Sequence, residues 1–173
     1  MINKYNIKSY QEWKNWTDED FALVSIEEQL YFSKLRRKFK LVNNLDVLEI
    51  GFGNGSFLDF SRKVGWNISG VELHPNLISI ATRDGFEVFD NIYEIPKNNK
   101  YDLIVALDVL EHIESDDFPK FFAKIKNCLN PEGTILIRTP NGSSPFALAN
   151  QYGDVTHKSV ITEGKRARFG CPI

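Results

Sequence analysis

The sequence has too few cysteines for a disulfide framework. Only Cys128 and Cys171 occur among its 173 residues, whereas disulfide-stabilised domains carry many more. Cys128 falls within an amphipathic helical pattern, which predicts a buried free thiol. No apolar run approaches the length needed to cross a bilayer, and the first residues do not resemble a secretory signal. Together these absences favour a cytoplasmic location and no membrane partner.

A large net charge is also absent. The formal net charge of −2 at pH 7 gives no general attraction to nucleic acid or anionic membranes, so a nucleic-acid partner is not expected. The composition, 42% hydrophobic and 25% charged, is that of an ordinary globular protein. A chain of this length fits one domain with a substantial core.

Residues 9–40 have a helical pattern. The acidic run 18–20 suits the positive end of a helix dipole, and the basic run 36–38 suits the negative end. The apolar face predicted for this helix consists of Phe21, Leu23, Val24, Leu30, Tyr31 and Leu35. The same region carries the aromatic side chains Trp13, Trp16 and Phe32.

From residue 45 the pattern alternates between strands and helices. Residues 101–107 form a continuous apolar run, as expected for a strand buried on both faces. The alternation predicts an α/β fold with a parallel, doubly wound sheet, whose ligands bind at the carboxyl ends of the strands. Strands are predicted at 47–50, 66–72, 86–89, 101–107 and 134–138, helices at 56–64, 75–83 and about 116–129, and a turn at 130–133.

A cluster of glycines follows the first predicted strand. Gly51, Gly53 and Gly55 open the next helix, and glycine lets a backbone turn sharply and approach a ligand closely. Glu72 ends the second strand, at the distance where an acid can bind ribose hydroxyls. Ser56 occupies the position of the third glycine in the pyrophosphate fingerprint. The pattern therefore predicts a nucleotide site without that fingerprint, and a plain tight turn is the alternative.

The segment Glu49-Ile50-Gly51-Phe52-Gly53-Asn54-Gly55 resembles the first motif of class I S-adenosylmethionine-dependent methyltransferases. Segments 70–72, 89–96, 101–112 and 129–134 resemble that family's later motifs in the same order. The resemblance covers about residues 45–140. It implies a Rossmann-like sheet with strand order 3-2-1-4-5, S-adenosylmethionine as the cofactor, and an N-terminal helical lid at residues 1–44. The cofactor-binding residues implied are Glu49, Gly51, Gly53, Asn54, Gly55, Glu72, Asp90, Asn91 and Leu107.

The loop after the fourth strand carries candidate catalytic groups. Asp108 and His112 would lie beside the methyl group, and the resemblance to sugar and polysaccharide methyltransferases brings the 154–157 segment, with His157, over the acceptor pocket. A histidine with a near-neutral pKa suits removal of a hydroxyl proton. We predict catalytic roles for Asp108, His112 and His157. The alternative for His112 is a structural histidine that orients the loop.

The same loop also resembles a metal-ligand set. Ubiquinone-biosynthesis O-methyltransferases and small-RNA 2′-O-methyltransferases carry an acid-x-x-Glu-His run, matched here by Asp108, Glu111 and His112. The RNA enzymes add a His-x-x-His pair, of which Asp154 replaces one histidine and His157 matches the other. Such groups can hold Mg²⁺ or Mn²⁺. Many methyltransferases have the Glu-His pair without a metal, so we predict none here, with an ion as the alternative.

The family sheet normally has seven strands, and residues 141–173 show no strand alternation. We therefore expect strands six and seven to be missing, with 141–173 forming an acceptor-side loop and an irregular tail. Strand five would then lie at an exposed edge, which favours pairing with a second chain or cover by the tail.

Methyl transfer to a hydroxyl of a small-molecule or sugar-linked acceptor is the leading functional hypothesis. The alternatives are a non-catalytic S-adenosylmethionine-binding module and, less favoured because of Ser56, a nicotinamide-dependent oxidoreductase.

Overall fold

The structure is a computed structural model that describes residues 16–144, 154 and 156–162. Trp13 and Cys171 therefore lie outside the described residues, as do residues 9–15 of the predicted helical region. The elements are α2 (Ile26–Lys38), β1 (Asp46–Ile50), α3 (Ser56–Lys63), β2 (Asn67–Val71), α4 (Pro75–Arg83), β3 (Glu87–Phe89), η1 (Ile92–Glu94), β4 (Tyr101–Leu107), η2 (Leu110–His112), η3 (Ser115–Asp117), α5 (Phe118–Cys128) and β5 (Leu129–Arg138).

The described strands form one sheet in the order β3-β2-β1-β4-β5, and all its neighbouring pairs are parallel. This confirms the predicted doubly wound α/β fold and its strand order. The strand order reverses between β1 and β4, which lie side by side at the centre of the sheet. Both strands were predicted from apolar runs in the sequence. The carboxyl ends of all strands therefore meet at one edge, where ligands bind in such folds.

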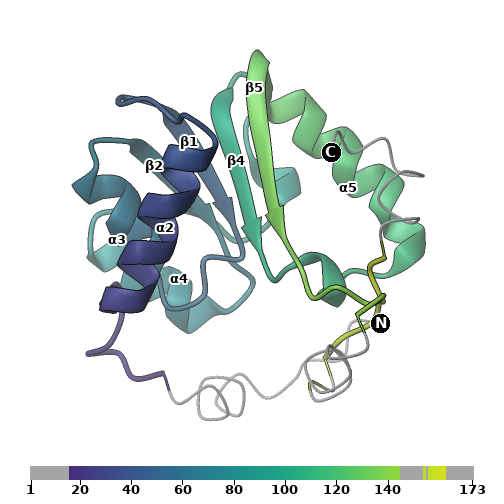
Figure 1. The fold of residues 1–173 in the computed structure, drawn as a ribbon, viewed down its shortest axis with the longest axis horizontal. Helices are drawn as coiled ribbons and strands as arrows, with labels where there is room; N and C mark the ends of the chain where they lie inside the picture. The colour runs from purple at the N-terminus through teal and green to yellow at the C-terminus, as the bar shows by residue number, and fades with distance from the viewer. Residues whose placement is uncertain (1–15, 145–153, 155, 163–173) are drawn as a thin grey trace.

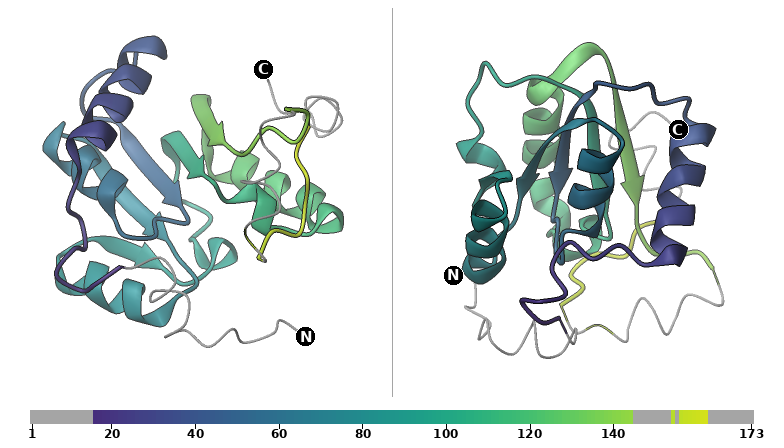
Figure 2. Two further views of the ribbon diagram at one scale, coloured as in Figure 1. Left: turned by 60° about the horizontal axis from the view of Figure 1, so that its bottom comes forward. Right: turned by 90° about the vertical axis from the view of Figure 1, so that its left-hand side faces the viewer.

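Helices cover both faces of the sheet (Figures 1 and 2). Alternate residues of the central strands point to opposite faces: Val47 and Leu103 belong to the core under α3 and α4, whereas Leu48 and Ile104 belong to the core under α5. All four side chains are fully buried. Because helices cover both faces of the sheet, side chains on both faces of a central strand are buried, and the strand is therefore a continuous apolar run in the sequence.

The thiol prediction is confirmed, since Cys128 is a free cysteine buried on the core side of α5. Among the described residues, no helix combines the length and apolar character that a membrane span requires.

The helical pattern predicted for residues 9–40 is wrong for the described residues 16–25. Residues 18–22 form turns, and Ala22 has a positive φ of 61°. The helix begins only at Ile26, where Ser25 and Glu28 form a reciprocal capping box. That local signal supplies acceptors for the first N–H groups of the helix, which the acidic run 18–20 does not.

The predicted apolar face of this region also needs correction. Phe21 is buried, but it lies in the loop before α2. Leu23 and Leu30 are 61% and 66% exposed. The helix packs through Phe32, which contacts the rings of Phe57 and Phe60 on α3. The other members of the predicted face, Val24, Tyr31 and Leu35, are partly buried against the same core, as predicted.

Strand β5 begins at Leu129, five residues before its predicted start. Leu129 pairs with Tyr101, and the regular register resumes where Thr134 pairs with Leu103. The residues predicted as a turn, 130–133, therefore lie within β5 as an irregularity in the pairing.

Among the described residues, β5 pairs with β4 alone and lies at an edge of the sheet. The described residues beyond 140 contain no strand. Gly142 N–H donates to the Ile161 carbonyl at 2.8 Å, so the two parts of this segment lie side by side. Pairing of β5 with a second chain stays a prediction.

Candidate functional site

The glycine loop between β1 and α3 is closely packed. Gly51 has a φ of +71°, and a Cβ there would lie 2.7 Å from the Val109 side chain. Gly53 has a φ of +53°, and a Cβ there would lie 2.9 Å from the Trp16 ring. Both the left-handed backbone and the short approaches require glycine. The loop is therefore held between the chain after β4 and the N-terminal segment.

The N-terminal segment 16–25 lies against this loop. Ala22 N–H donates to the Asn54 carbonyl at 2.7 Å, and the Phe21 ring occupies the space beside Gly55. Trp16 adds the contact at Gly53. The segment therefore packs against the glycine loop, and the helical lid predicted at residues 1–44 stays a prediction.

The Glu72 carboxylate links the glycine loop to the chain after β2. Its Oε2 accepts from Gly53 N–H at 3.1 Å, and its Oε1 accepts from Leu73 N–H at 2.7 Å and His74 N–H at 3.2 Å. The residue is 8% exposed. A carboxylate has about four acceptor positions, so these three bonds leave capacity for a ligand hydroxyl.

Glu49 is buried at the end of β1, directly below the glycine loop. It is 3% exposed, and its Oε2 has no hydrogen-bond partner among the described residues. Burial raises the pKa of this carboxyl well above its ordinary value, and repulsion by Glu72 raises it further, while Arg138 acts in the opposite direction. A buried carboxylate without a partner is costly, and a cationic ligand group would satisfy it.

The other predicted cofactor residues lie at the same edge of the sheet. Asp90 and Asn91 are exposed and follow β3, and the Asn91 side chain accepts from Tyr93 N–H at 3.0 Å to cap η1. Leu107 is half-buried at the end of β4. The Asn54 Oδ1 faces Ser56 N–H at 3.4 Å at the start of α3.

Asp108 has an ion-pair partner. Its carboxylate accepts from both Nε and a terminal nitrogen of Arg138, at 3.1 and 2.6 Å. Its N–H also donates to the Arg138 carbonyl at 2.8 Å. The Arg138 guanidinium lies 5.1 Å from the centre of the Tyr31 ring. The predicted catalytic carboxylate is thus held by β5, and its catalytic role stays a prediction.

Glu111 is fully enclosed under the loop that follows β4. It is 1% exposed, and its Oε2 accepts from the Thr139 hydroxyl at 3.1 Å. Burial raises the pKa of this carboxyl. The Glu111 carbonyl accepts from the N–H groups of Lys158 and Ser159, at 2.7 and 3.0 Å. Glu111 therefore joins β5 and the 156–162 segment to this loop.

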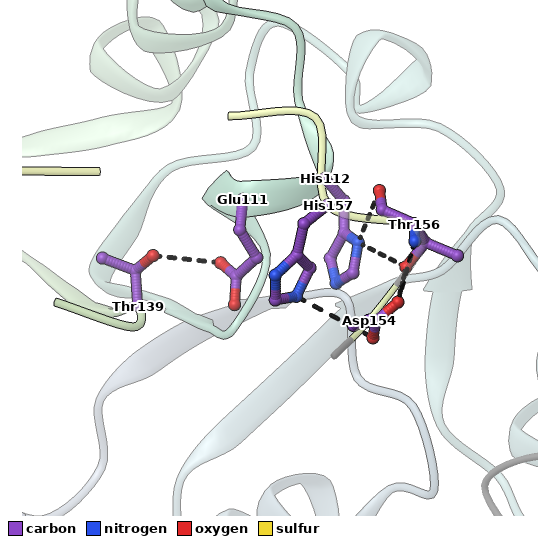
Figure 3. A network of polar contacts seen from close by, with 6 residues as sticks. All are labelled: Glu111, His112, Thr139, Asp154, Thr156 and His157. Carbon is purple, nitrogen blue, oxygen red and sulfur yellow. Dashed lines mark hydrogen bonds and ion pairs between the residues drawn. The ribbon is translucent and has the colours of Figure 1, made fainter. Parts of the chain in front are cut away.

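Two histidines from distant parts of the sequence meet here (Figure 3). The ring centres of His112 and His157 are 4.9 Å apart. Thr156 contacts His112 Nδ1 through its carbonyl at 3.3 Å and its hydroxyl at 3.0 Å. His157 Nε2 lies 3.8 Å from the Asp154 carboxylate. The structure thus brings together two of the three predicted catalytic residues.

Glu111, His112 and His157 also satisfy the geometry of a metal site. Each offers one ligand atom, and these three atoms lie within 4.8 Å of one another. A carboxylate and two imidazoles are donors that Mn²⁺ or other divalent ions accept. Asp154 and Asp108, the remaining acids of the sequence pattern, are not members of this cluster.

The sequence analysis assigned no role to Arg138, Thr139 or Thr156. Arg138 is the last residue of β5 and Thr139 follows it, both at the ligand edge. Their position at the end of a predicted strand was the signal that could have identified them. Thr156 is 44 residues from His112 in the sequence, and only the folded chain reveals that the two meet.

The five-stranded sheet and its glycine loop define a Rossmann-like protein with a nucleotide-type site at the carboxyl ends of its strands. The profile of the Methyltransferase domain family matches residues 24–168, and the chain belongs to that family.

Individual relatives are distant. A ubiquinone biosynthesis O-methyltransferase of Rickettsia bellii is 23% identical over an alignment 155 residues long, and the match covers 81% of this chain and 63% of the relative. The chain thus spans about three fifths of the length of this curated relative. Solved structures that share the fold include a SAM-dependent methyltransferase from Archaeoglobus fulgidus, with a TM-score of 0.71, 21% identity and coverage of 95% of this chain and 72% of that one. Coclaurine N-methyltransferase bound to N-methylheliamine and SAH gives a TM-score of 0.65 at 14% identity, with coverage of 83% and 48%.

Replacing Glu72 by alanine is expected to weaken binding of S-adenosylhomocysteine. The ribose diol would lose a charged acceptor worth roughly 1.5–3 kcal/mol, or about 10- to 150-fold in affinity. Isothermal titration calorimetry measures this change, with NAD as a ligand expected not to bind. The matched control is Glu132→Ala. Glu132 is an exposed glutamate near the start of β5, at the end of the strand away from the glycine loop. An unchanged affinity in Glu72→Ala would exclude Glu72 from the ribose site.

Replacing Glu49 by glutamine is expected to change stability and binding in opposite directions. Because the folded-state pKa lies above the ordinary value of 4.5, the native protein retains a proton that the unfolded chain loses. The free energy of unfolding therefore falls as pH rises from that value through the raised pKa. Glutamine removes this loss, so the variant should be more stable at neutral pH and bind S-adenosylhomocysteine more weakly. Urea unfolding at several pH values tests the first effect. If the free energy of unfolding depends on pH in the same way in both proteins, the prediction is contradicted.

Proposed function

We propose that the chain binds S-adenosylmethionine at the glycine loop and transfers its methyl group to a hydroxyl of a small-molecule or sugar-linked acceptor. The observation that carries the proposal is the unpartnered, buried carboxylate oxygen of Glu49 beneath that loop. The ammonium group in the methionine part of the cofactor has the charge and donors that this oxygen lacks.

The charge of the site argues against a dinucleotide. Glu49 and Glu72 are both buried beside the glycine loop and interact electrostatically. Two carboxylates would repel a pyrophosphate, whereas they favour a ligand that carries an ammonium and a sulfonium. Ser56 in place of the fingerprint's third glycine agrees with this choice. The nicotinamide-dependent alternative is therefore the weaker one.

The binding roles follow from position. Glu49 would pair with the cofactor's ammonium, Glu72 would accept from its ribose diol, and the backbone of the glycine loop would approach the methionine part. Asp90, Asn91 and Leu107 would border the adenine. Glu49 and Leu107 lie within the last two residues of β1 and β4, and the other residues follow the ends of β1, β2 and β3. One ligand lying along this edge of the sheet would therefore reach all of them.

His112 is the proposed general base. The cofactor supplies an activated methyl group and its own leaving group. The protein must then align the acceptor oxygen, which alone can supply about 7–11 kcal/mol, and remove its proton. His112 lies in η2, immediately after the strand whose end borders the cofactor site. The Rickettsia relative's name, an O-methyltransferase, supports a hydroxyl as the acceptor group.

Replacing His112 by asparagine is expected to reduce methyl transfer by about 10²- to 10⁴-fold. Asparagine keeps a donor near the Nδ1 position but has no basic nitrogen. The assay follows radiolabelled methyl from S-adenosylmethionine onto catechol and onto methyl glucoside, which represent phenolic and sugar hydroxyls. Affinity for S-adenosylhomocysteine and the unfolding midpoint should match those of the unsubstituted protein. Equal losses of stability and activity would instead support a structural histidine, and turnover with neither probe beside tight cofactor binding would support the non-catalytic alternative.

Binding of a divalent ion is a second candidate role for Glu111, His112 and His157. The observation that favours it is that their three ligand atoms lie within 4.8 Å of one another. An ion there would orient the acceptor hydroxyl and favour its ionised form. Prolonged dialysis against a chelator separates the two roles. We expect activity to survive chelation if His112 is the base, whereas loss of activity that Mn²⁺ restores would favour the metal site.

A further inference from the structure

His112 meets two oxygen atoms of one residue through its Nδ1. The Thr156 carbonyl oxygen lies 3.3 Å from this nitrogen, and the Thr156 hydroxyl oxygen lies 3.0 Å from it (Figure 3). A carbonyl oxygen can only accept a hydrogen bond. The direction of the second contact depends on where the hydroxyl sends its single proton.

Asp154 fixes the direction of that hydroxyl. The Thr156 hydroxyl donates to Asp154 Oδ1 at 2.5 Å, and Thr156 N–H donates to the same oxygen at 2.9 Å. With its proton directed to the carboxylate, the hydroxyl faces His112 as an acceptor. Both Thr156 oxygens therefore accept from Nδ1, and this nitrogen must carry the proton. In a neutral imidazole, Nε2 is then the basic nitrogen.

We infer that Thr156 and Asp154 are positioning residues that hold His112 in the tautomer whose Nε2 can remove the acceptor's proton. This inference rests on the proposed function of His112 as the base. In the step, the acceptor oxygen forms a bond to the methyl carbon as the carbon–sulfur bond breaks, and the hydroxyl proton moves to Nε2. The products are a methyl ether, S-adenosylhomocysteine and a protonated His112.

The same arrangement suits the charge that forms. Protonated His112 keeps its Nδ1–H bonds to Thr156, whose hydroxyl dipole continues to the Asp154 carboxylate. The second carboxylate oxygen of Asp154 lies 3.8 Å from His157 Nε2. A base oriented through its second nitrogen by a carboxylate-bound partner is the general arrangement of catalytic histidines.

The segment that carries Thr156 is anchored independently of this bond. Lys158 and Ser159 N–H groups donate to the Glu111 carbonyl, and the Ser159 hydroxyl donates to the Ile113 carbonyl at 2.7 Å. These bonds join the residues on either side of His112 to those just after Thr156. Loss of the Thr156 hydroxyl should therefore alter the ring's proton position without detaching the segment.

Nitrogen NMR of the histidine rings tests the inference without turnover. The chain has three histidines, so a ¹⁵N-histidine sample bound to S-adenosylhomocysteine, with chelator present, gives a spectrum that single substitutions can assign. At a pH where its ring is neutral, His112 is expected in the Nδ1–H form. Thr156→Val and Asp154→Ala should each shift it toward the Nε2–H form. The first removes the nearer of the two acceptors and leaves only the carbonyl at 3.3 Å, and the second frees the hydroxyl to donate its proton to Nδ1. Thr156→Ser should retain the Nδ1–H form.

An Nε2–H ring in the unsubstituted protein, or an unchanged tautomer in both Thr156→Val and Asp154→Ala, would overturn the inference. With whichever probe hydroxyl is methylated, Thr156→Val should lower kcat by about 10- to 100-fold at an unchanged KM for the cofactor, and Thr156→Ser should restore most of it. Because the ring spectrum requires no acceptor, the absence of methyl transfer would count against the proposed function and leave the tautomer result standing.

Discussion

The burial of two carboxylates at the carboxyl edge of the sheet is the constraint on which the site depends. Glu49 is the last residue but one of β1 and Glu72 follows β2, and the parallel pairing of these strands brings both close to the glycine loop. The Glu49 position does not suit a charge in the absence of a counterion. The loop offers the Gly53 N–H to Glu72 but no partner to Glu49 Oε2. The fold thus keeps the Glu49 carboxyl buried at a cost in stability, and a bound cationic group would offset that cost.

The sequence predicted this edge well because its signals are local and repeated. Short apolar runs gave the strands, and each run ended in residues that suit a ligand. In a parallel doubly wound sheet the strand ends necessarily meet, so Glu49, Glu72 and Leu107 could be grouped without knowledge of their distances. Strand order came from the family resemblance, and the structure confirms it.

Contacts between distant loops were beyond the sequence. Periodicity could not show that the capping box at Ser25, rather than the acids at 18–20, starts α2, because both patterns suit a helix start. It could not show that β5 takes in residues 130–133, because their turn composition is compatible with an irregular strand. The meeting of Thr156 with His112 depends on the path of the chain after β5, for which no periodic pattern exists.

Asp108 illustrates how backbone strain and side-chain pairing combine at the site. Its φ of +57° costs a residue other than glycine about 1–2 kcal/mol, although aspartate tolerates it better than most. This turn directs the chain after β4 into η2, which carries Glu111 and His112. The two bonds from Arg138 and the backbone bond to its carbonyl hold Asp108 in that conformation. Arg138 also acts electrostatically on Glu49, so one residue of β5 influences both the proposed cofactor side and the proposed acceptor side. Because the Asp108 carboxylate is already bound through both oxygens to Arg138, these contacts favour a role for Asp108 in shaping the loop and leave the proposed proton transfer to His112.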